Sequence, residues 1–187
     1  MQKLITTTGI VLMAALSFPE ALHADSLQSG PQAGEKVPGP FAPLNLTGPN
    51  AGQKCCQYCK NGSRPVVAVF AREATPAVIQ LLKAIDDATA MDREQGLGSY
   101  VVFCNEADGL GRRLQDIAQK EKLQHIVFTL YKAGGPEKYR LAPAADVTVL
   151  VYHHLTIKAN HAFKNGDLTE AAIGAVGTDI AKMLAEK

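Results

Sequence analysis

The feature that most constrains this chain is a cysteine cluster placed directly before an apolar, strand-like run. Cys55, Cys56 and Cys59 lie close together, and Cys56 and Cys59 form a CxxC. Turn-forming residues follow, and residues 66–70 then read Val-Val-Ala-Val-Phe, which is typical of a buried strand. The chain is therefore expected to contain a central strand with sulfur chemistry on its N-terminal side.

Strand-like and helix-like segments alternate after this cluster. Helical spacing of apolar residues predicts a helix starting at Thr75-Pro76, a second near Asp108-Gly109, and a final helix that follows an Asp167-x-x-Glu170 variant of the capping box. The predicted strands cover residues 44–46, 66–70, 100–104, 126–131, 147–152 and 157–163. This order, β-α-β-α-β followed by β-β-α, predicts an α/β fold with a parallel core, right-handed crossovers and a closing hairpin.

The N-terminal part has the composition of a leader. Lys3 precedes an apolar run over residues 4–18, and Leu22-His23-Ala24 is a possible cleavage site, so residues 1–24 are predicted to be a signal peptide. Residues 25–40 are rich in Gly, Pro, Ser and Gln and are expected to form a flexible linker or an extended arm. Residues 41–187 are expected to form one domain in an exported, periplasmic or extracellular protein.

Charge and composition exclude several partners. Removal of residues 1–24 takes away Lys3 and Glu20, which leaves 18 basic and 17 acidic residues and an unchanged net charge of +1. This balance, with no Trp, gives no case for binding nucleic acid. No stable membrane span is expected after signal cleavage, no cofactor is implied, and a protein partner is possible but unidentified.

Several motifs together resemble the thioredoxin-like superfamily, in particular peroxiredoxins and exported thiol–disulfide oxidoreductases. They are Pro65 with the strand after it, the Thr75-Pro76 helix start, the terminal β-β-α unit, and the stretch Gly39-Pro40-Phe41-Ala42-Pro43-Leu44-Asn45-Leu46, which looks like a leading strand. The resemblance implies a thioredoxin-like sandwich, with a central mixed sheet flanked by helices.

The usual active-site positions of those families depart from the pattern. A peroxiredoxin carries Thr-Pro-x-Cys where this chain has Thr75-Pro76-Ala77-Val78, so Val78 stands at the place of the peroxide-reactive cysteine. A thioredoxin carries its CxxC around residues 72–76, where this chain has no cysteine, and its active-site proline would fall at Asp146-Val147-Thr148. Chemistry at the usual site is therefore not expected.

The cysteines leave two readings open. Four cysteines allow three complete pairings, and export favours disulfides. We expect Cys56 and Cys59 to pair, either as a relocated redox pair or as a structural disulfide in an irregular surface loop. Cys104 ends a predicted strand at the opposite end of the sheet and is expected to be a buried free thiol, although a bridge to Cys55 is an alternative.

Three functions follow from these readings. The first is an exported thioredoxin-like protein that has lost the usual active site and exchanges disulfides through Cys56 and Cys59; whether it is an enzyme stays open. The second is a non-catalytic binding or structural module held by the same disulfide. The third is a copper-binding protein with unknown ligands, because the overlapping Cys55-x-x-x-Cys59 spacing and a distant His resemble copper-handling thioredoxin-fold proteins. His153-His154, the only adjacent histidine pair, is expected to point to opposite faces of a strand and so not to bind one metal jointly.

Overall fold

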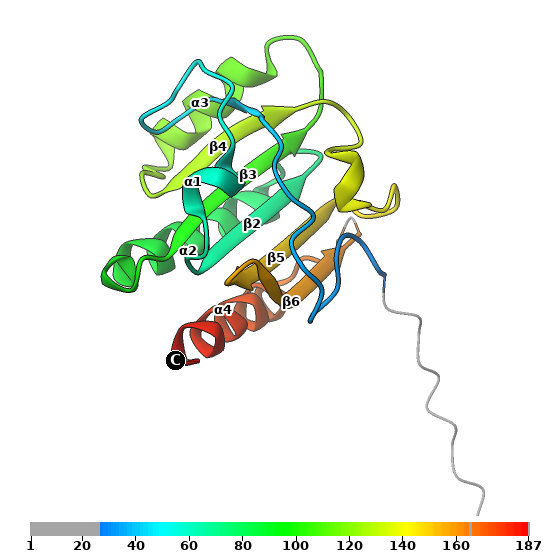
Figure 1. Cartoon of the computed structure of the whole chain (residues 1–187). Coiled ribbons are helices and arrows are strands. Elements are labelled where there is room, and N and C mark those ends of the chain that lie inside the picture. Colours follow the sequence, from blue (N-terminus) through cyan, green and yellow to red (C-terminus); the bar gives the residue numbers. More distant parts are fainter. Residues whose placement is uncertain (1–26, 165, 187) are drawn as a thin grey trace, which may run out of the picture.

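A computed structural model describes residues 27–164 and 166–186, so the predicted signal peptide lies outside the described residues. Within these ranges six strands form one mixed sheet in the order β1-β4-β3-β2-β5-β6 (Figure 1). The strands are β1 (Leu44–Asn45), β2 (Val66–Ala71), β3 (Gly98–Cys104), β4 (Ile126–Tyr131), β5 (Val147–His153) and β6 (Thr156–Phe163). Strands β2, β3 and β4 are parallel, whereas β1, β5 and β6 pair antiparallel with their neighbours. The predicted α/β architecture is confirmed.

The central strand β2 separates two buried clusters. Its side chains alternate: Val67 and Val69 contribute to the cluster on one face, and Val66, Ala68 and Phe70 contribute to the cluster on the other. All six residues of β2 are buried. Burial on both faces explains why the run is continuously apolar rather than alternating.

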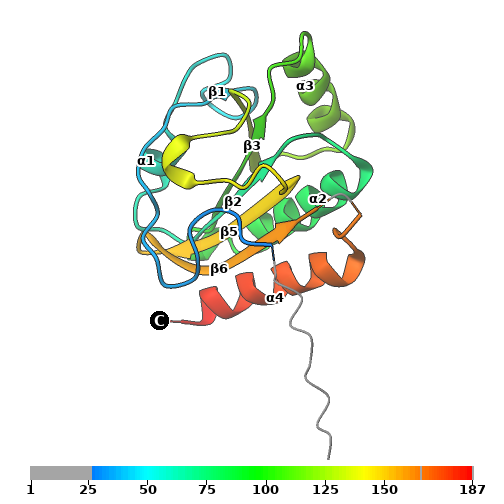
Figure 2. The same ribbon diagram turned by 90° about the vertical axis from the view of Figure 1, so that its right-hand side faces the viewer.

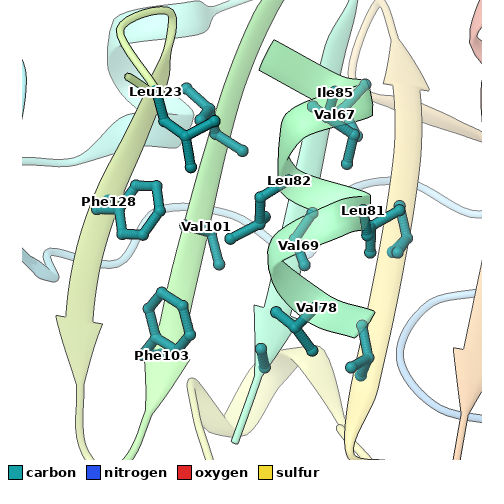
Figure 3. Packing of buried hydrophobic residues seen from close by; sticks show 14 of the residues in the cluster. Val67, Val69, Val78, Leu81, Leu82, Ile85, Val101, Phe103, Leu123 and Phe128 are labelled. Carbon is teal, nitrogen blue, oxygen red and sulfur yellow. The ribbon is translucent and has the colours of Figure 1, made fainter. Parts of the chain in front are cut away.

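In the described residues three long helices cover one face of the sheet (Figure 2), and Figure 3 shows the side chains of one of them packed against the strands. They are α2 (Pro76–Met91), α3 (Leu110–Lys120) and α4 (Glu170–Ala185). The predicted cap of α2 is confirmed, because Thr75 Oγ1 accepts a hydrogen bond from the Val78 backbone N–H at 3.3 Å. The cap of α4 is Thr169, not the predicted Asp167: Thr169 Oγ1 accepts from the Ala172 N–H at 3.2 Å.

The opposite face carries the short helix α1 (Gln57–Asn61), the N-terminal arm and the 3-10 turn η2 (Glu137–Tyr139). A second 3-10 turn, η1 (Arg93–Gln95), follows α2. The stretch around Cys56 and Cys59 was expected to be an irregular loop. It is helical, and Gly62 ends it with a φ of 56°. A glycine after the last helical residue is the usual helix stop, and Asn61-Gly62 was interpreted only as a turn.

Residues 27–40 form an arm that lies along β5 and β6. The Ser29 and Thr148 hydroxyls lie 2.6 Å apart, Asn160 Nδ2 donates to the Ser29 carbonyl at 2.8 Å, and Val37 N–H donates to the Leu155 carbonyl at 3.0 Å. Ser29 and Val37 are buried. Packed contacts therefore extend N-terminal to residue 41, and residues 27–40 lie against the sheet.

The hairpin between β5 and β6 corrects one expectation. His154 and Leu155 form its turn with φ values of 50° and 57°, which turns the chain sharply after His153. The rings of His153 and His154 consequently stack, with centroids 4.0 Å apart, instead of pointing to opposite faces. The error came from applying strand geometry to both histidines, beyond the predicted strand end at residue 152. Neither His154 nor Leu155 is the Asn or Gly that a turn of this kind usually contains.

Candidate functional site

Cys56 and Cys59 form a disulfide, as expected, with their Cα atoms 5.3 Å apart. Cys59 is exposed and Cys56 is half-buried, and neither belongs to the two buried clusters of the sheet. Cys55 and Cys104 are free, so the alternative Cys55–Cys104 bridge is wrong. Of the four cysteines, Cys59 is exposed, Cys55 and Cys56 are half-buried, and Cys104 is buried.

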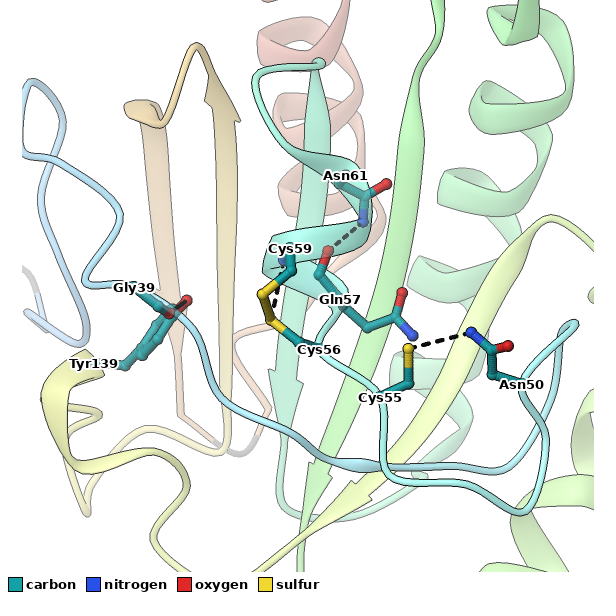
Figure 4. The surroundings of a disulfide bond; sticks show 8 residues. All are labelled: Gly39, Asn50, Cys55, Cys56, Gln57, Cys59, Asn61 and Tyr139. Atoms are coloured by element: carbon teal, nitrogen blue, oxygen red, sulfur yellow. Dashed lines mark hydrogen bonds between the residues drawn. A yellow bond between two sulfur atoms is a disulfide. The ribbon is translucent and has the colours of Figure 1, made fainter.

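Helix α1 is held in place by contacts that do not involve the disulfide. Gln57 Nε2 donates to Asn45 Oδ1 at 3.1 Å, and Asn61 Nδ2 donates to the Gln57 carbonyl at 2.9 Å. Tyr58 packs against the buried cluster on this face. Figure 4 shows Gln57 and Asn61 on one flank of α1 and the disulfide on the other. The sequence reasoning missed these supports, although buried polar residues at positions i and i+4 are typical of a helix anchored at its polar side.

Cys56 is also the N-cap of α1. Its Sγ accepts a hydrogen bond from the Cys59 backbone N–H at 3.0 Å. A backbone donor aimed at a sulfur favours the charged thiolate over the neutral thiol once the disulfide is reduced. The neighbouring Cys55 Sγ accepts from Asn50 Nδ2 at 3.2 Å. The geometry therefore makes Cys56 the better leaving group of the pair.

The start of α2 lies on the other face of the sheet. A cavity of about 200 Å³ opens there, lined by Glu73, Thr75, Val78 and Asp146 among others. Val78 is only 3% exposed and belongs to the helix-covered cluster. Among the described residues no cysteine lines this cavity, and no cis peptide bond occurs.

Cys104 lies at the C-terminal end of β3, as predicted, and is buried. Gly98, at the other end of β3, lies beside Asn61, the last residue of α1. Six residues of strand, about 20 Å, therefore separate Cys104 from the C-terminal end of α1. Burial raises the pKa of its thiol to about 12, against a smaller opposing effect of the Arg72 charge. Cys104 is therefore a neutral core thiol at physiological pH, away from the disulfide.

No group of three or more His, Cys, Asp or Glu side chains with metal-binding geometry occurs in residues 27–164 and 166–186. None of the helices in these ranges is both long enough and apolar enough to cross a membrane.

Solved structures with a similar fold agree with the resemblance seen in the sequence. A candidate thiol:disulfide interchange protein DsbE from Chlorobium tepidum is 15% identical, with 85% of this chain and 99% of that chain covered and a TM-score of 0.60. A candidate protein disulfide isomerase from Bacteroides thetaiotaomicron is 13% identical, with 86% and 96% covered and a TM-score of 0.65. The peroxidoxin BcpB from Mycobacterium tuberculosis is 14% identical, with 83% and 98% covered and a TM-score of 0.60.

These similarities show that the chain has a thioredoxin-like α/β fold. The Cys56–Cys59 disulfide is a feature of its own structure. No family model matches the sequence, and no curated protein matches it.

Proposed function

We propose that this chain exchanges thiols and disulfides through Cys56 and Cys59. The observation that carries the proposal is the position of the disulfide: Cys59 is exposed, while Gln57, Tyr58 and Asn61 hold α1 on the sheet through contacts other than the S–S bond. This bridge closes a very short loop, which limits what it can add to stability.

The exchange proceeds in two steps on a dithiol substrate. The substrate's first thiolate attacks the exposed Sγ of Cys59, which forms a mixed disulfide and breaks the Cys56–Cys59 bond. The electron pair of the broken bond remains on Cys56 Sγ, where the Cys59 N–H stabilises the thiolate. The second substrate thiolate then attacks the substrate sulfur of the mixed disulfide and releases Cys59 as a thiolate. The substrate leaves as a disulfide, and the protein is left reduced by two electrons.

The usual site of thioredoxin-like proteins has no part in this proposal. Val78, which occupies the position of a peroxidatic cysteine in the resemblance, is a buried aliphatic side chain without a nucleophile. We therefore propose that this end of the sheet has lost redox chemistry. The stacked His153 and His154 do not by themselves favour copper binding, because two nitrogen ligands are fewer than a protein copper centre usually has.

We also propose that the protein is exported, with a mature N-terminus near Asp25. The basic start and the apolar run of residues 4–18 support a signal peptide, and an oxidised cysteine pair fits an oxidising compartment. Intact-mass analysis of the exported fraction tests this proposal. A mass that includes Met1 would contradict it.

The exchange activity is tested by reduction of insulin in the presence of dithiothreitol. The wild-type protein should accelerate the reaction, and Cys56→Ser and Cys59→Ser should each return it to the uncatalysed rate. Cys55→Ser is the matched control, because it removes the adjacent free thiol and should retain the activity. If Cys59→Ser is as active as the wild type, or if the bridge resists mild reductant and its loss unfolds the protein, the disulfide belongs to a non-catalytic module instead.

A further inference from the structure

A second cavity, on the flank of α1 away from the disulfide, is lined by cations. It has a volume of about 410 Å³ and lies at the N-terminal ends of β3 and β4, where Lys60, Arg64, Arg93 and His125 contribute to its walls. No Asp or Glu side chain lines it. In the described residues, none of Lys60, Arg64 and Arg93 forms an ion pair. Three fixed positive charges therefore face one solvent-filled space without compensation.

This arrangement favours an anion in the space, because exposed cations without a carboxylate partner attract anions. Lys60 belongs to the last turn of α1, and Arg64 follows Asn61, the last residue of that helix, by three positions. Arg93 reaches the same cavity from η1, about thirty positions further along the sequence. Charges that only served solubility would be dispersed over the surface or paired with carboxylates, as Lys83 is with Glu121.

Hydrogen bonds to neighbouring residues orient the Arg64 guanidinium. Its Nε donates to the Asn61 carbonyl at 3.2 Å, and its Nη2 donates to the Lys60 carbonyl and to Asn61 Oδ1, both at 3.1 Å. Its Nη1 has no hydrogen-bond partner among the described residues. A guanidinium fixed in this way loses little side-chain entropy when it binds an anionic oxygen.

The floor of the cavity is polar as well. The buried hydroxyls of Thr89 and Ser99 lie 2.7 Å apart, and Thr89 also donates to the Ile85 carbonyl at 2.7 Å. The volume falls in the range of small-molecule sites and is larger than one inorganic anion needs. We propose that this cavity binds a compact organic or inorganic polyanion, with at least two phosphate or carboxylate groups that span Arg64 and Arg93. The site is separate from the proposed exchange chemistry.

The test is calorimetric titration of the oxidised protein at one fixed ionic strength with pyrophosphate, citrate and orthophosphate. Pyrophosphate, citrate or both should bind saturably, and orthophosphate at least tenfold more weakly, because it offers the cations one anionic group instead of two or more. A preference of tenfold or more between pyrophosphate and citrate identifies the phosphate or the carboxylate as the recognised group. Equal affinities define a site for any compact polyanion. If neither saturates below about 10 mM, or if orthophosphate binds as well as both, the proposal is wrong.

Substitutions of the cationic residues test whether the anion binds in this cavity. Lys60→Gln combined with Arg93→Gln leaves the hydrogen bonds of Arg64 intact and should weaken binding at least tenfold. Arg64→Lys keeps the charge but loses the planar fork, and it should weaken binding severalfold. Arg112→Gln combined with Arg113→Gln on α3 is the control, because it removes the same charge outside the cavity and should change the affinity less than twofold. An equal loss in the control would show that binding follows net charge alone and would overturn the site.

Discussion

Gly98, the first residue of β3, lies so close to Asn61 that a methyl group on residue 98 would overlap Asn61 Oδ1. Asn61 in turn accepts a hydrogen bond from Arg64 and donates one to the Gln57 carbonyl. The absence of a side chain at Gly98 therefore leaves the space that Asn61 occupies at the C-terminal end of α1. The glycine is required by this close approach and not by its backbone angles.

Gly98→Ala should therefore destabilise the protein by about 1–3 kcal/mol, because Asn61 must move and its hydrogen bonds must break. Urea unfolding measures the change. Gly174→Ala in α4 is the matched control: nothing lies within 4 Å of the added methyl group, and alanine favours the helix, so stability should stay equal or rise by up to about 1 kcal/mol. Equal effects of the two substitutions would contradict the close contact.

The N-cap role of Cys56 predicts a difference between two replacements. In a Cys59→Ser background, Cys56→Ser keeps an oxygen that can accept from the residue 59 N–H, whereas Cys56→Ala loses the cap. The alanine variant should be less stable by about 1 kcal/mol, as measured by thermal or urea unfolding. Equal stabilities would mean that the cap contributes nothing once the disulfide is gone.

Substitution of the buried Asp86 should have a larger effect on stability. This buried carboxylate accepts hydrogen bonds from the backbone N–H groups of His125 and Ile126 at 2.7 and 2.8 Å. Asp86→Ala leaves those donors without a partner and should cost about 2–4 kcal/mol in unfolding free energy. Asp86→Asn retains an acceptor oxygen and should lose clearly less; if both variants lose the same amount, the two hydrogen bonds are not what stabilises the start of β4.

Cys104 makes stability depend on pH in the alkaline range. The unfolded thiol titrates near its ordinary pKa of 9.0, whereas burial raises the folded pKa to about 12, so above pH 9 the unfolded chain binds fewer protons than the folded one. Stability is fully present below pH 9 and falls as the pH rises toward 12. Between pH 9 and 10 the loss should be about 1 kcal/mol.

A Cys104→Ala variant should show a flatter profile between pH 9 and 10, although it is less stable overall. Burial also raises the pKa of Tyr152 to about 12, and it raises the pKa values of Tyr139 and Tyr100. These tyrosines therefore add to the loss of stability above pH 10. Urea unfolding at a series of pH values measures both profiles. An unchanged slope in the variant would show that Cys104 is not the group that titrates.

The parts of the fold that the sequence predicted correctly are those with a local signal. The apolar run of β2 and the Thr75-Pro76 start of α2 depend on neighbouring residues, and both are confirmed. Helix α1 was missed because its five residues have no apolar period, and its stability comes from distant groups such as Asn45. The turn at His154 was missed because the backbone there takes positive φ angles without glycine or asparagine.

The candidate site was predictable only in part. The CxxC spacing indicated the Cys56–Cys59 bridge, which the structure contains. Its exposure could not be predicted, because that depends on how α1 lies on the sheet. Lys60, Arg64 and Arg93 line the same cavity. This cavity could not be predicted, because no local pattern in the sequence places a residue of η1 beside the end of α1.

The arm over β5 and β6 has a consequence for the order of folding. Its contacts join residues far apart in the sequence: Ser29 meets Thr148 across 119 positions, and Pro31 accepts from Asn160 across 129. As the chain emerges from the ribosome or a translocation pore, the arm is made first but has nothing to dock on until the hairpin exists. Contacts of such high sequence separation form slowly. The face of β5 and β6 that the arm covers therefore stays exposed until late in folding.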